Sequence, residues 1–126
     1  MAPKKSPKTI ALIAHDGKKK EMLEFVKDHK NFFDGFHLVA TATTGKNVET
    51  LGLKVKKVLS GPIGGDAQIA AMVATGACQA VIFFRDPLGM HAHEADISSL
   101  LRICEVHDVP LVTNPASARL IVKAFK

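Results

Sequence analysis

The sequence predicts an α/β fold, with an open, mostly parallel sheet of five strands and helices on both of its faces. Three observations carry this prediction. Short apolar runs and amphipathic segments alternate along the whole chain. The length of 126 residues is that of a single domain. With 47% hydrophobic and 23% charged residues, the composition is typical of a globular chain and unlike a disordered one.

The first β–α–β unit is expected within residues 9–41. Residues 9–14 form a short apolar run rich in Ile, which is typical of a buried parallel strand. Residues 18–30 carry apolar side chains on one broad face and predict a helix, for which Asp16 is a candidate cap. Residues 36–41 predict the second strand.

The next segment is expected to supply a helix, a strand and a second helix. Residues 44–51 predict a short helix after a Thr-Gly turn. Residues 53–59 alternate apolar and basic side chains, which predicts a third strand near an edge of the sheet. Residues 64–75 are rich in Ala and predict a helix, with Gly76 in position to end it.

The last third of the chain completes the pattern. Residues 80–84 are continuously apolar and predict a central fourth strand. Residues 95–106 predict a helix, residues 110–113 a fifth strand, and residues 116–125 a closing helix. Strands and helices that alternate in this way predict a sheet of the flavodoxin-like or Rossmann-like kind.

The net charge of +5 belongs largely to the start of the chain. Residues 1–8 hold Lys4, Lys5 and Lys8 and no acid, so we expect a basic, flexible N-terminus before a domain that spans residues 9–126. The remaining charge is small, and the absence of Tyr and Trp leaves few surfaces on which bases could stack. We therefore expect no nucleic-acid partner.

The apolar runs and the cysteines indicate a cytoplasmic protein. No run approaches the roughly 18 residues that span a bilayer. The first run stops at His15, which makes it too short for a secretory signal. Cys78 and Cys104 lie in apolar sequence, so we expect reduced core cysteines. No membrane partner is expected.

Polar residues follow the strands at the ends where a ligand is expected. In an open parallel sheet, ligands bind at the carboxyl ends of the strands. His15 directly follows the first strand, and polar or glycine-rich loops follow the next three at residues 41–45, 60–66 and 85–96. These loops are therefore expected to converge on one rim of the sheet.

The loop after the third strand is suited to holding a phosphate. Ser60, Gly61, Gly64 and Gly65 precede Asp66 at the expected start of a helix. Glycines let the backbone approach a ligand, and free N–H groups at a helix start attract anions. The alternative is a tight turn in which Asp66 interacts with the helix dipole.

The loop after the second strand offers a similar set of groups. Thr41, Thr43 and Thr44 supply hydroxyls beside Ala42 and Gly45, and would complete an anion cradle. The alternative is that Thr43 or Thr44 caps the following helix.

The charged residues near this rim also allow two interpretations of their role. Lys19 is either a phosphate ligand in the first turn of its helix or a solvated lysine. His15 beside Asp16 is either a proton-transfer group or a turn histidine. Asp86 would face the same rim as Asp66, and paired carboxylates in different environments can act as acid and base.

A metal site is a further possibility at the loop after the fourth strand. His91, His93 and Asp96 lie close together in the sequence, but their spacing is not that of the zinc signatures and no cysteine joins them. We therefore expect no metal ion here.

Five motifs in this order resemble those of the methylglyoxal synthase family. They are Ala-His-Asp at 14–16, Thr-Thr-Gly at 43–45, Leu-Ser-Gly-Pro-Ile-Gly-Gly-Asp at 59–66, Phe-Phe-Arg-Asp-Pro-Leu at 83–88 and Thr-Asn at 113–114. The likeness covers about residues 9–122. The glycine-rich stretch is its most specific element.

The resemblance implies a lyase that converts dihydroxyacetone phosphate to methylglyoxal and inorganic phosphate, as a bypass of glycolysis, without a cofactor. The catalytic positions that it implies are Asp66 as the base, with His15, His93, Asp16, Asp86 and Asp96 near the substrate. The phosphate-binding positions that it implies are Lys19, Thr41, Ala42, Thr43, Thr44, Ser60, Gly61, Gly64 and Gly65. It also implies a cytoplasmic homohexamer, with free phosphate as product and inhibitor.

Two departures from the family pattern concern the phosphate. A glycine is common in the family at the position of Ala42, so a negative φ is expected there. Family members often have a longer C-terminal tail that supplies a basic residue near the phosphate. Here either that contact is lost, or Arg85, Lys123 or a neighbouring subunit replaces it.

The alternative function is a non-catalytic regulatory domain. Such domains of larger enzymes resemble the same family and bind phosphorylated or nucleotide effectors. A binding module would not require Asp66, His15 and His93 together. The presence of all three favours the enzyme.

Overall fold

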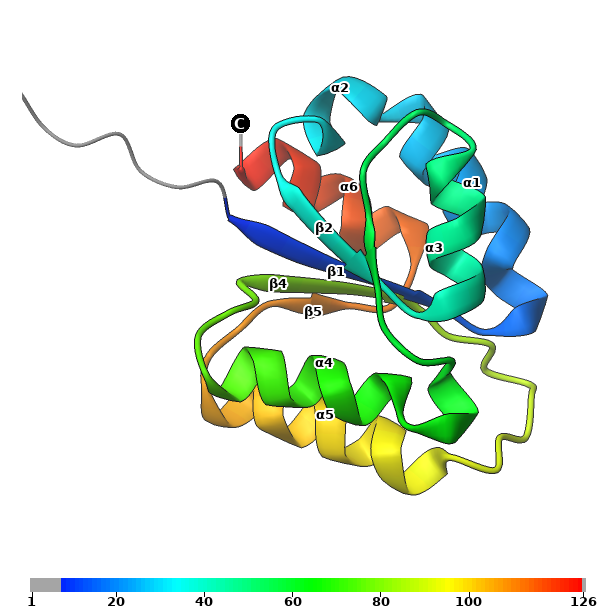
Figure 1. Ribbon diagram of the computed structural model, residues 1–126. Helices are drawn as coiled ribbons and strands as arrows, with labels where there is room; N and C mark the ends of the chain where they lie inside the picture. Colours follow the sequence, from blue (N-terminus) through cyan, green and yellow to red (C-terminus); the bar gives the residue numbers. More distant parts are fainter. Residues whose placement is uncertain (1–7, 126) are drawn as a thin grey trace, which may run out of the picture.

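A five-stranded parallel sheet forms the centre of the computed structural model, which describes residues 8–125 (Figure 1). The strand order is β3-β2-β1-β4-β5, and each neighbouring pair is parallel. The strands are β1 (Thr9–Ala14), β2 (His37–Ala40), β3 (Lys56–Lys57), β4 (Ala80–Phe84) and β5 (Leu111–Val112). The predicted fold class is confirmed.

Helices cover both faces of the sheet. The helices on one face are α1 (Lys19–Asp28), α2 (Lys30–Phe33), α3 (Ala42–Glu49) and α6 (Pro115–Ala124). The helices on the other face are α4 (Gly65–Ala74) and α5 (Glu94–Val106). Two short 3₁₀ turns, η1 (Asp16–Lys18) and η2 (Gly61–Ile63), lead into α1 and α4.

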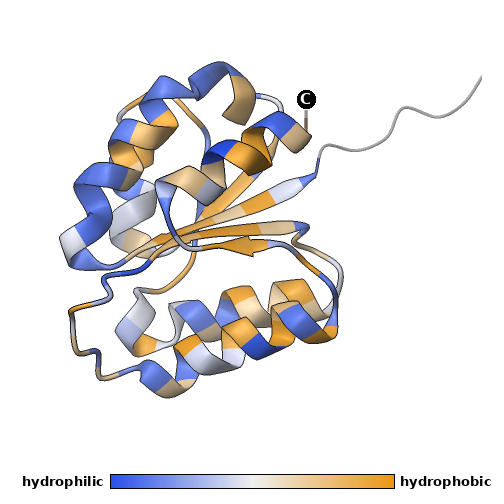
Figure 2. Ribbon diagram, turned by 180° about the vertical axis from the view of Figure 1, so that it is seen from behind, coloured by the Kyte–Doolittle hydropathy of each residue, from blue (hydrophilic) through white to orange (hydrophobic). Residues whose placement is uncertain are grey.

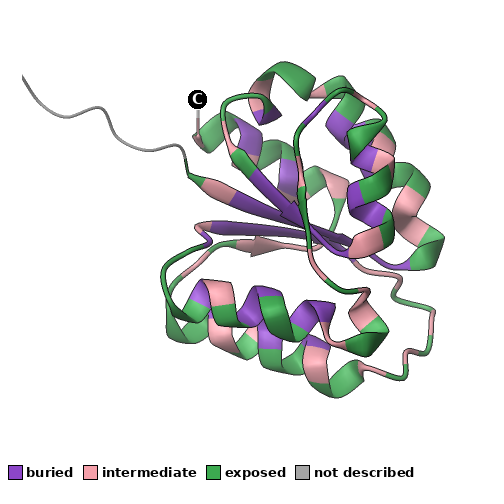
Figure 3. Cartoon of the chain, viewed as in Figure 1, coloured by how far each residue is buried: buried purple, intermediate pink, exposed green. Residues whose placement is uncertain are grey.

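The sheet separates two hydrophobic cores. Successive side chains of a strand point to opposite faces, so Ile10 and Leu12 enter the core beneath α1, α3 and α6, whereas Ala11 and Ile13 enter the core against α4 and α5. Apolar residues accordingly follow the strands and the inward faces of the helices (Figure 2). The central strands β1 and β4 are buried along their length, apart from the half-buried Thr9 (Figure 3).

Both outer strands are shorter than the sequence predicts. The third strand, expected over residues 53–59, pairs only at Lys56–Lys57, because Leu53 turns into the core on the α1 side. Its position at an edge is as predicted. The fifth strand, expected over residues 110–113, pairs only at Leu111–Val112, and beyond it one long hydrogen bond of 3.4 Å runs from Arg85 N–H to the Thr113 carbonyl.

Three helix starts differ from those expected. Asp16 does not cap α1, because the chain makes the η1 turn first and the Asp16 side chain is exposed. Helix α3 begins at Ala42, and Thr41 occupies its N-cap, so neither Thr43 nor Thr44 caps it. The φ of Ala42 is negative, as expected. The separate helix α2 was not anticipated, and it buries Phe33.

The predicted basic N-terminal segment falls largely outside the described residues. Of its lysines, Lys8 is described: its carbonyl accepts a hydrogen bond from His37 N–H at 2.9 Å, and its Nζ lies 5.3 Å from the Phe125 ring centroid. Among residues 8–125, no helix has the length and apolar character needed to cross a membrane.

The order of the strands reverses next to β1. The chain runs from β1 to β2 and β3 on one side, and then returns to place β4 on the other side. Such a switch point opens a crevice at the carboxyl ends of the two central strands. His15 follows β1 and Asp86 lies two residues after β4, so both stand at this crevice.

The turn into α4 depends on a glycine at position 65. A Cβ atom at Gly65 would collide with the carbonyl oxygen of Leu59, which is backbone and cannot rotate away. We expect Gly65→Ala to lower the free energy of unfolding by about 3 kcal/mol, the upper end of the usual cost of overpacking. Urea denaturation followed by circular dichroism measures this loss.

Gly35 provides a matched control for Gly65. A Cβ there would meet only the Phe32 carbonyl at 3.5 Å, an ordinary contact, and its φ is not in the left-handed region. Gly35→Ala should therefore be neutral or slightly stabilising. Equal stability of both variants would contradict the tight-turn explanation.

Candidate active site

A cavity of about 620 Å³ lies at the crevice between β1 and β4. It is bordered by the loops that the sequence placed on one rim. The predicted site residues that line it are His15, Asp16, Lys19, Thr41, Thr43, Ser60, Gly61, Asp66, Asp86 and His93. The expected convergence of these loops is thus present in the structure.

Five predicted site residues do not line this cavity. Ala42 and Thr44 lie in the first turn of α3, and Gly64 and Gly65 form the turn into α4. Asp96 lies in the first turn of α5. Two of the five act on residues of the cavity: Thr44 accepts a hydrogen bond from Lys19, and Asp96 contributes to the raised pKa of Asp66.

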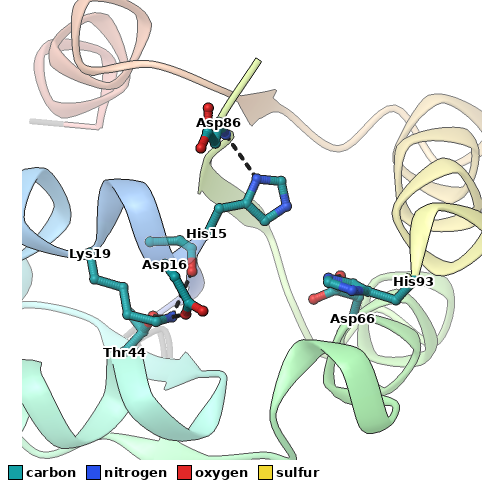
Figure 4. A network of polar contacts seen from close by, with 8 residues as sticks. His15, Asp16, Lys19, Thr44, Asp66, Asp86 and His93 are labelled. Carbon is teal, nitrogen blue, oxygen red and sulfur yellow. Dashed lines mark hydrogen bonds and ion pairs between the residues drawn. The ribbon is translucent and has the colours of Figure 1, made fainter. Parts of the chain in front are cut away.

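The His15 ring is held in a defined tautomer. The backbone N–H of Asp86 donates to His15 Nδ1 at 2.8 Å, so the proton of the neutral ring is on Nε2 (Figure 4). Burial lowers the pKa of His15 to about 4, with smaller contributions from His91, His93 and Arg85. His15 is therefore a neutral N–H donor at physiological pH.

Asp66 and His93 form the second chemical element of the cavity. Asp66 lies in the first turn of α4 and is fully buried. Its Oδ2 is 3.5 Å from His93 Nε2, beyond a good hydrogen-bond distance, and neither carboxylate oxygen has a hydrogen-bond partner (Figure 4). Burial raises the pKa of Asp66, and Asp96 adds to that rise. The carboxylate is thus a strengthened base.

His93 is positioned by the start of α5. It occupies the N-cap of that helix, and its carbonyl accepts hydrogen bonds from the backbone N–H groups of Asp96 and Ile97. Ile97 is fully buried in the core against α4. The packing of α5 on α4 therefore sets the approach of His93 to Asp66.

Gly61 lies against this pair from the η2 turn. A Cβ atom at Gly61 would stand 3.2 Å from His93 Nε2 and 3.3 Å from Asp66 Oδ1. Only a residue without a side chain leaves both groups where they are. The glycine-rich loop therefore leaves room for the Asp66–His93 pair.

Lys19 supplies the positive charge at the other end of the cavity. Its Nζ donates to the Ala14 carbonyl at 2.7 Å and to Thr44 Oγ1 at 3.4 Å, and it lies 3.7 Å from Asp16 Oδ1 (Figure 4). Burial lowers the pKa of Lys19, partly opposed by Asp16. A half-buried ammonium group beside Thr41 is a suitable anion ligand.

Unsatisfied polar atoms make this cavity the candidate functional site. Buried side-chain atoms without a hydrogen-bond partner are uncommon in folded proteins. Within residues 8–125 they belong to four residues, His15, Asp66, His91 and His93, and all four line this cavity. A larger cavity of about 850 Å³, near the amino end of β2, is lined by none of them.

His91 and Gly17 also line the cavity, although the sequence did not predict them as site residues. His91 was considered only as a metal ligand, yet its ring stacks on His15. Gly17 packs against Asp86, since an added Cβ would lie 2.9 Å from Asp86 Oδ2. Among residues 8–125, no group of three or more His, Cys, Asp or Glu is arranged to hold a metal ion.

The basic residues proposed to replace a longer C-terminal tail lie elsewhere. Arg85 lines a neighbouring cavity with Lys18 and Asn114, and Lys123 is exposed on α6. Neither lines the cavity that holds Asp66. Among the described residues, Lys19 is the one basic side chain of the lysine or arginine type that lines that cavity.

Comparison with known proteins identifies the family. A family model described as the MGS-like domain matches residues 21–113. The chain belongs to the MGS-like family. It is 57% identical over 117 residues to methylglyoxal synthase from Carboxydothermus hydrogenoformans, covering 92% of this chain and 97% of that protein. It is 54% identical over 115 residues to the methylglyoxal synthase of Moorella thermoacetica, covering 90% of each.

A solved structure of another family member agrees with the fold. The crystal structure of methylglyoxal synthase from Elizabethkingia anophelis matches with a TM-score of 0.86 and 42% identity, covering 92% of this chain and 77% of that one. The resemblance inferred from the five sequence motifs is confirmed.

The buried Asp66 carboxylate of this MGS-like domain should cost stability. Its raised pKa means that folding disfavours the ionised carboxylate. The resulting loss of stability is complete above the pKa of Asp66 in the folded protein, and it disappears below the ordinary carboxyl pKa of the unfolded chain. We expect Asp66→Asn to raise the free energy of unfolding at pH 7 by about 1 kcal/mol. The gain should shrink as the pH falls.

Thermal unfolding between pH 4 and 8 measures this difference. Asp34→Asn, at an exposed position after α2, is the matched control and should change little at any pH. If Asp66→Asn is less stable than the wild type at pH 7, burial of the ionised Asp66 carboxylate does not destabilise the fold.

Proposed function

We propose that this chain is a methylglyoxal synthase, a lyase that converts dihydroxyacetone phosphate to methylglyoxal and inorganic phosphate. The observation that carries the proposal is the fully buried, unpartnered carboxylate of Asp66, which shares a cavity with the neutral His15 donor. The names of its relatives, which it matches over nine-tenths or more of their length, agree with this reaction. A regulatory domain would have no use for such a base.

The first step is removal of a proton from the hydroxymethyl carbon beside the substrate carbonyl. Asp66 accepts this proton, since desolvation raises its pKa and makes it a stronger base. The electron pair of the C–H bond forms a C=C bond, and the carbonyl oxygen becomes the oxygen anion of an enediolate. His93, 3.5 Å from Asp66, is placed to orient the carboxylate.

The negative charge on that oxygen is stabilised by His15. Its Nε2–H is buried and has no partner in the cavity, so it is available to the substrate oxygen. A neutral imidazole donates a hydrogen bond without transferring its proton outright, which keeps the enediolate charged and ready to expel a leaving group. The low pKa of His15 keeps it in this form.

The second step is loss of phosphate from the neighbouring carbon. The terminal hydroxyl of the enediolate loses its proton and becomes the aldehyde carbonyl, the C=C bond shifts to the neighbouring carbon, and the C–O bond to phosphate breaks with its electron pair on the phosphate. The resulting enolate takes up one proton at its CH2 carbon to give methylglyoxal, and the phosphate takes up the other, so the protons lost from the C–H and O–H bonds are both returned. Charge on the departing phosphate is accepted by the Lys19 ammonium and by hydroxyl groups. The hydroxyl and backbone groups that line the cavity near it come from Thr41, Thr43, Ser60 and Gly61.

The assembly and location follow from the same proposal. We infer a cytoplasmic homohexamer, as the family resemblance implies. Large apolar side chains exposed near the cavity support contacts between subunits: Ile63 is 67% exposed, Leu88 93% and Met90 99%. Neighbouring subunits would also be able to bring a basic group to the phosphate. No nucleic acid or membrane is required.

The decisive experiment measures both products. Purified protein is incubated with dihydroxyacetone phosphate, phosphate is measured by colorimetry, and methylglyoxal is trapped as a dicarbonyl adduct. We expect equal amounts of the two products, with and without a chelator. Asp66→Asn should lower kcat by roughly 100- to 10,000-fold, the usual contribution of a general base.

A folded Asp66→Asn protein that keeps full activity would remove Asp66 from the mechanism. No turnover by the wild-type protein, together with tight binding of phosphate or nucleotides, would favour the regulatory alternative.

Gly61 allows a separate test of the geometry. In Gly61→Ala, the new methyl group must displace Asp66 or His93 by a few tenths of an ångström. We expect kcat to fall by about tenfold, because small displacements of a catalytic group are costly. Stability should change far less than in Gly65→Ala, since side chains yield where backbone does not. An unchanged kcat would show that the pair tolerates this shift.

A further inference from the structure

A second histidine ring lies directly on His15. His91, in the loop between β4 and α5, stacks its ring on that of His15 with 3.6 Å between centroids and 20° between planes. Its Nε2 atom is buried and has no hydrogen-bond partner. The reaction steps above give His91 no role.

The stacked ring completes the enclosure of His15. The His15 ring packs edge-to-face with the Phe83 ring, with 5.0 Å between centroids and 75° between planes. The backbone N–H of Asp86 donates a hydrogen bond to its Nδ1. His91 covers the face of the ring. Without His91, one face of His15 would border the cavity, and the ring would lose an aromatic contact that favours one orientation.

The loop that carries His91 turns this one side chain inward. Its neighbour Met90 is 99% exposed and Leu88 is 93% exposed, whereas His91 is half-buried. The inward path passes Gly89, where a Cβ would meet His91 Nε2 at 3.0 Å and Asp86 Oδ2 at 3.1 Å. Glycine at position 89 therefore leaves room for His91 to reach His15.

We propose that His91 is a positioning residue for His15: its stacked ring holds the Nε2–H of His15 toward the substrate oxygen and shields the His15 ring from water. This role rests on the proposed function of His15 as the donor to the enediolate. It does not require His91 to touch the substrate.

The charges around His15 act in the same direction as the shielding. The groups that face it are His91, His93 and Arg85, which disfavour a positive charge on His15, and Asp86, which favours one. Burial is the largest cause of the lowered pKa. Because His91 contributes both burial and charge, its removal should let His15 take up a proton at a higher pH.

The test compares two substitutions at position 91. His91→Ala removes the ring, and His91→Phe keeps a stacking ring without a charge. His107→Ala, which removes an exposed histidine at the end of α5, is the control. NMR of imidazole ¹⁵N labels reports the tautomer and pKa of His15 without substrate, and kcat/KM is measured from pH 4 to 8.

In His91→Ala we expect the His15 pKa measured by NMR to move up by about one pH unit. The ratio of kcat/KM between His91→Ala and the wild type should fall as the pH approaches that pKa. The Nε2–H tautomer should also become less dominant. His91→Phe should restore most of the tautomer preference and of the activity at pH 4.5, and His107→Ala should match the wild type.

Three results would overturn the proposal: an unchanged His15 titration in His91→Ala, a His91→Phe variant as impaired as His91→Ala, or an equal shift in His107→Ala. The NMR measurement decides the positioning role even if the protein releases no phosphate from dihydroxyacetone phosphate. A protein that releases no phosphate from dihydroxyacetone phosphate would overturn the proposed function and leave the positioning role of His91 standing.

Discussion

The hydrogen bond from the Asp86 backbone to His15 Nδ1 ties the site to the fold. It joins the residues that follow the two central strands, at the place where the strand order reverses. The backbone N–H of His15 in turn donates to the Phe84 carbonyl at 3.1 Å, so the pairing of β1 with β4 continues into the site. Rigid strands thus fix the tautomer of a side chain: the backbone N–H leaves Nε2 as the donor, whereas a carboxylate partner at Nδ1 would leave Nε2 as the acceptor.

The chemistry of the cavity comes from polar groups that folding leaves unsatisfied. Protein interiors rarely leave buried polar atoms without a partner, because each costs free energy. Here such atoms gather on His15, Asp66, His91 and His93. A substrate with a carbonyl oxygen and an acidic C–H bond offers partners to these groups. Stability is thereby exchanged for a prepared site.

The sequence predicted the fold and most of the site, because both depend on local patterns. Apolar runs identified β1 and β4, and loops at strand ends identified Asp66 and His15. The short β3 was not predictable, since Leu53 is apolar whether it pairs in a sheet or packs beneath a helix. The stacking of His91 was missed for a similar reason, because a loop residue shows no periodicity that would reveal which way it points.

The two halves of the reaction centre belong to different layers of the protein. His15 extends from the sheet, whereas Asp66 and His93 are carried by α4 and the start of α5. The spacing between donor and base is therefore set by the thickness of the core between these layers, where Ile69 and Val73 pack against Val81 and Phe83. Exchanging one aliphatic residue for another in that core, far from any substrate atom, offers evolution a fine adjustment of turnover that leaves every cavity residue unchanged.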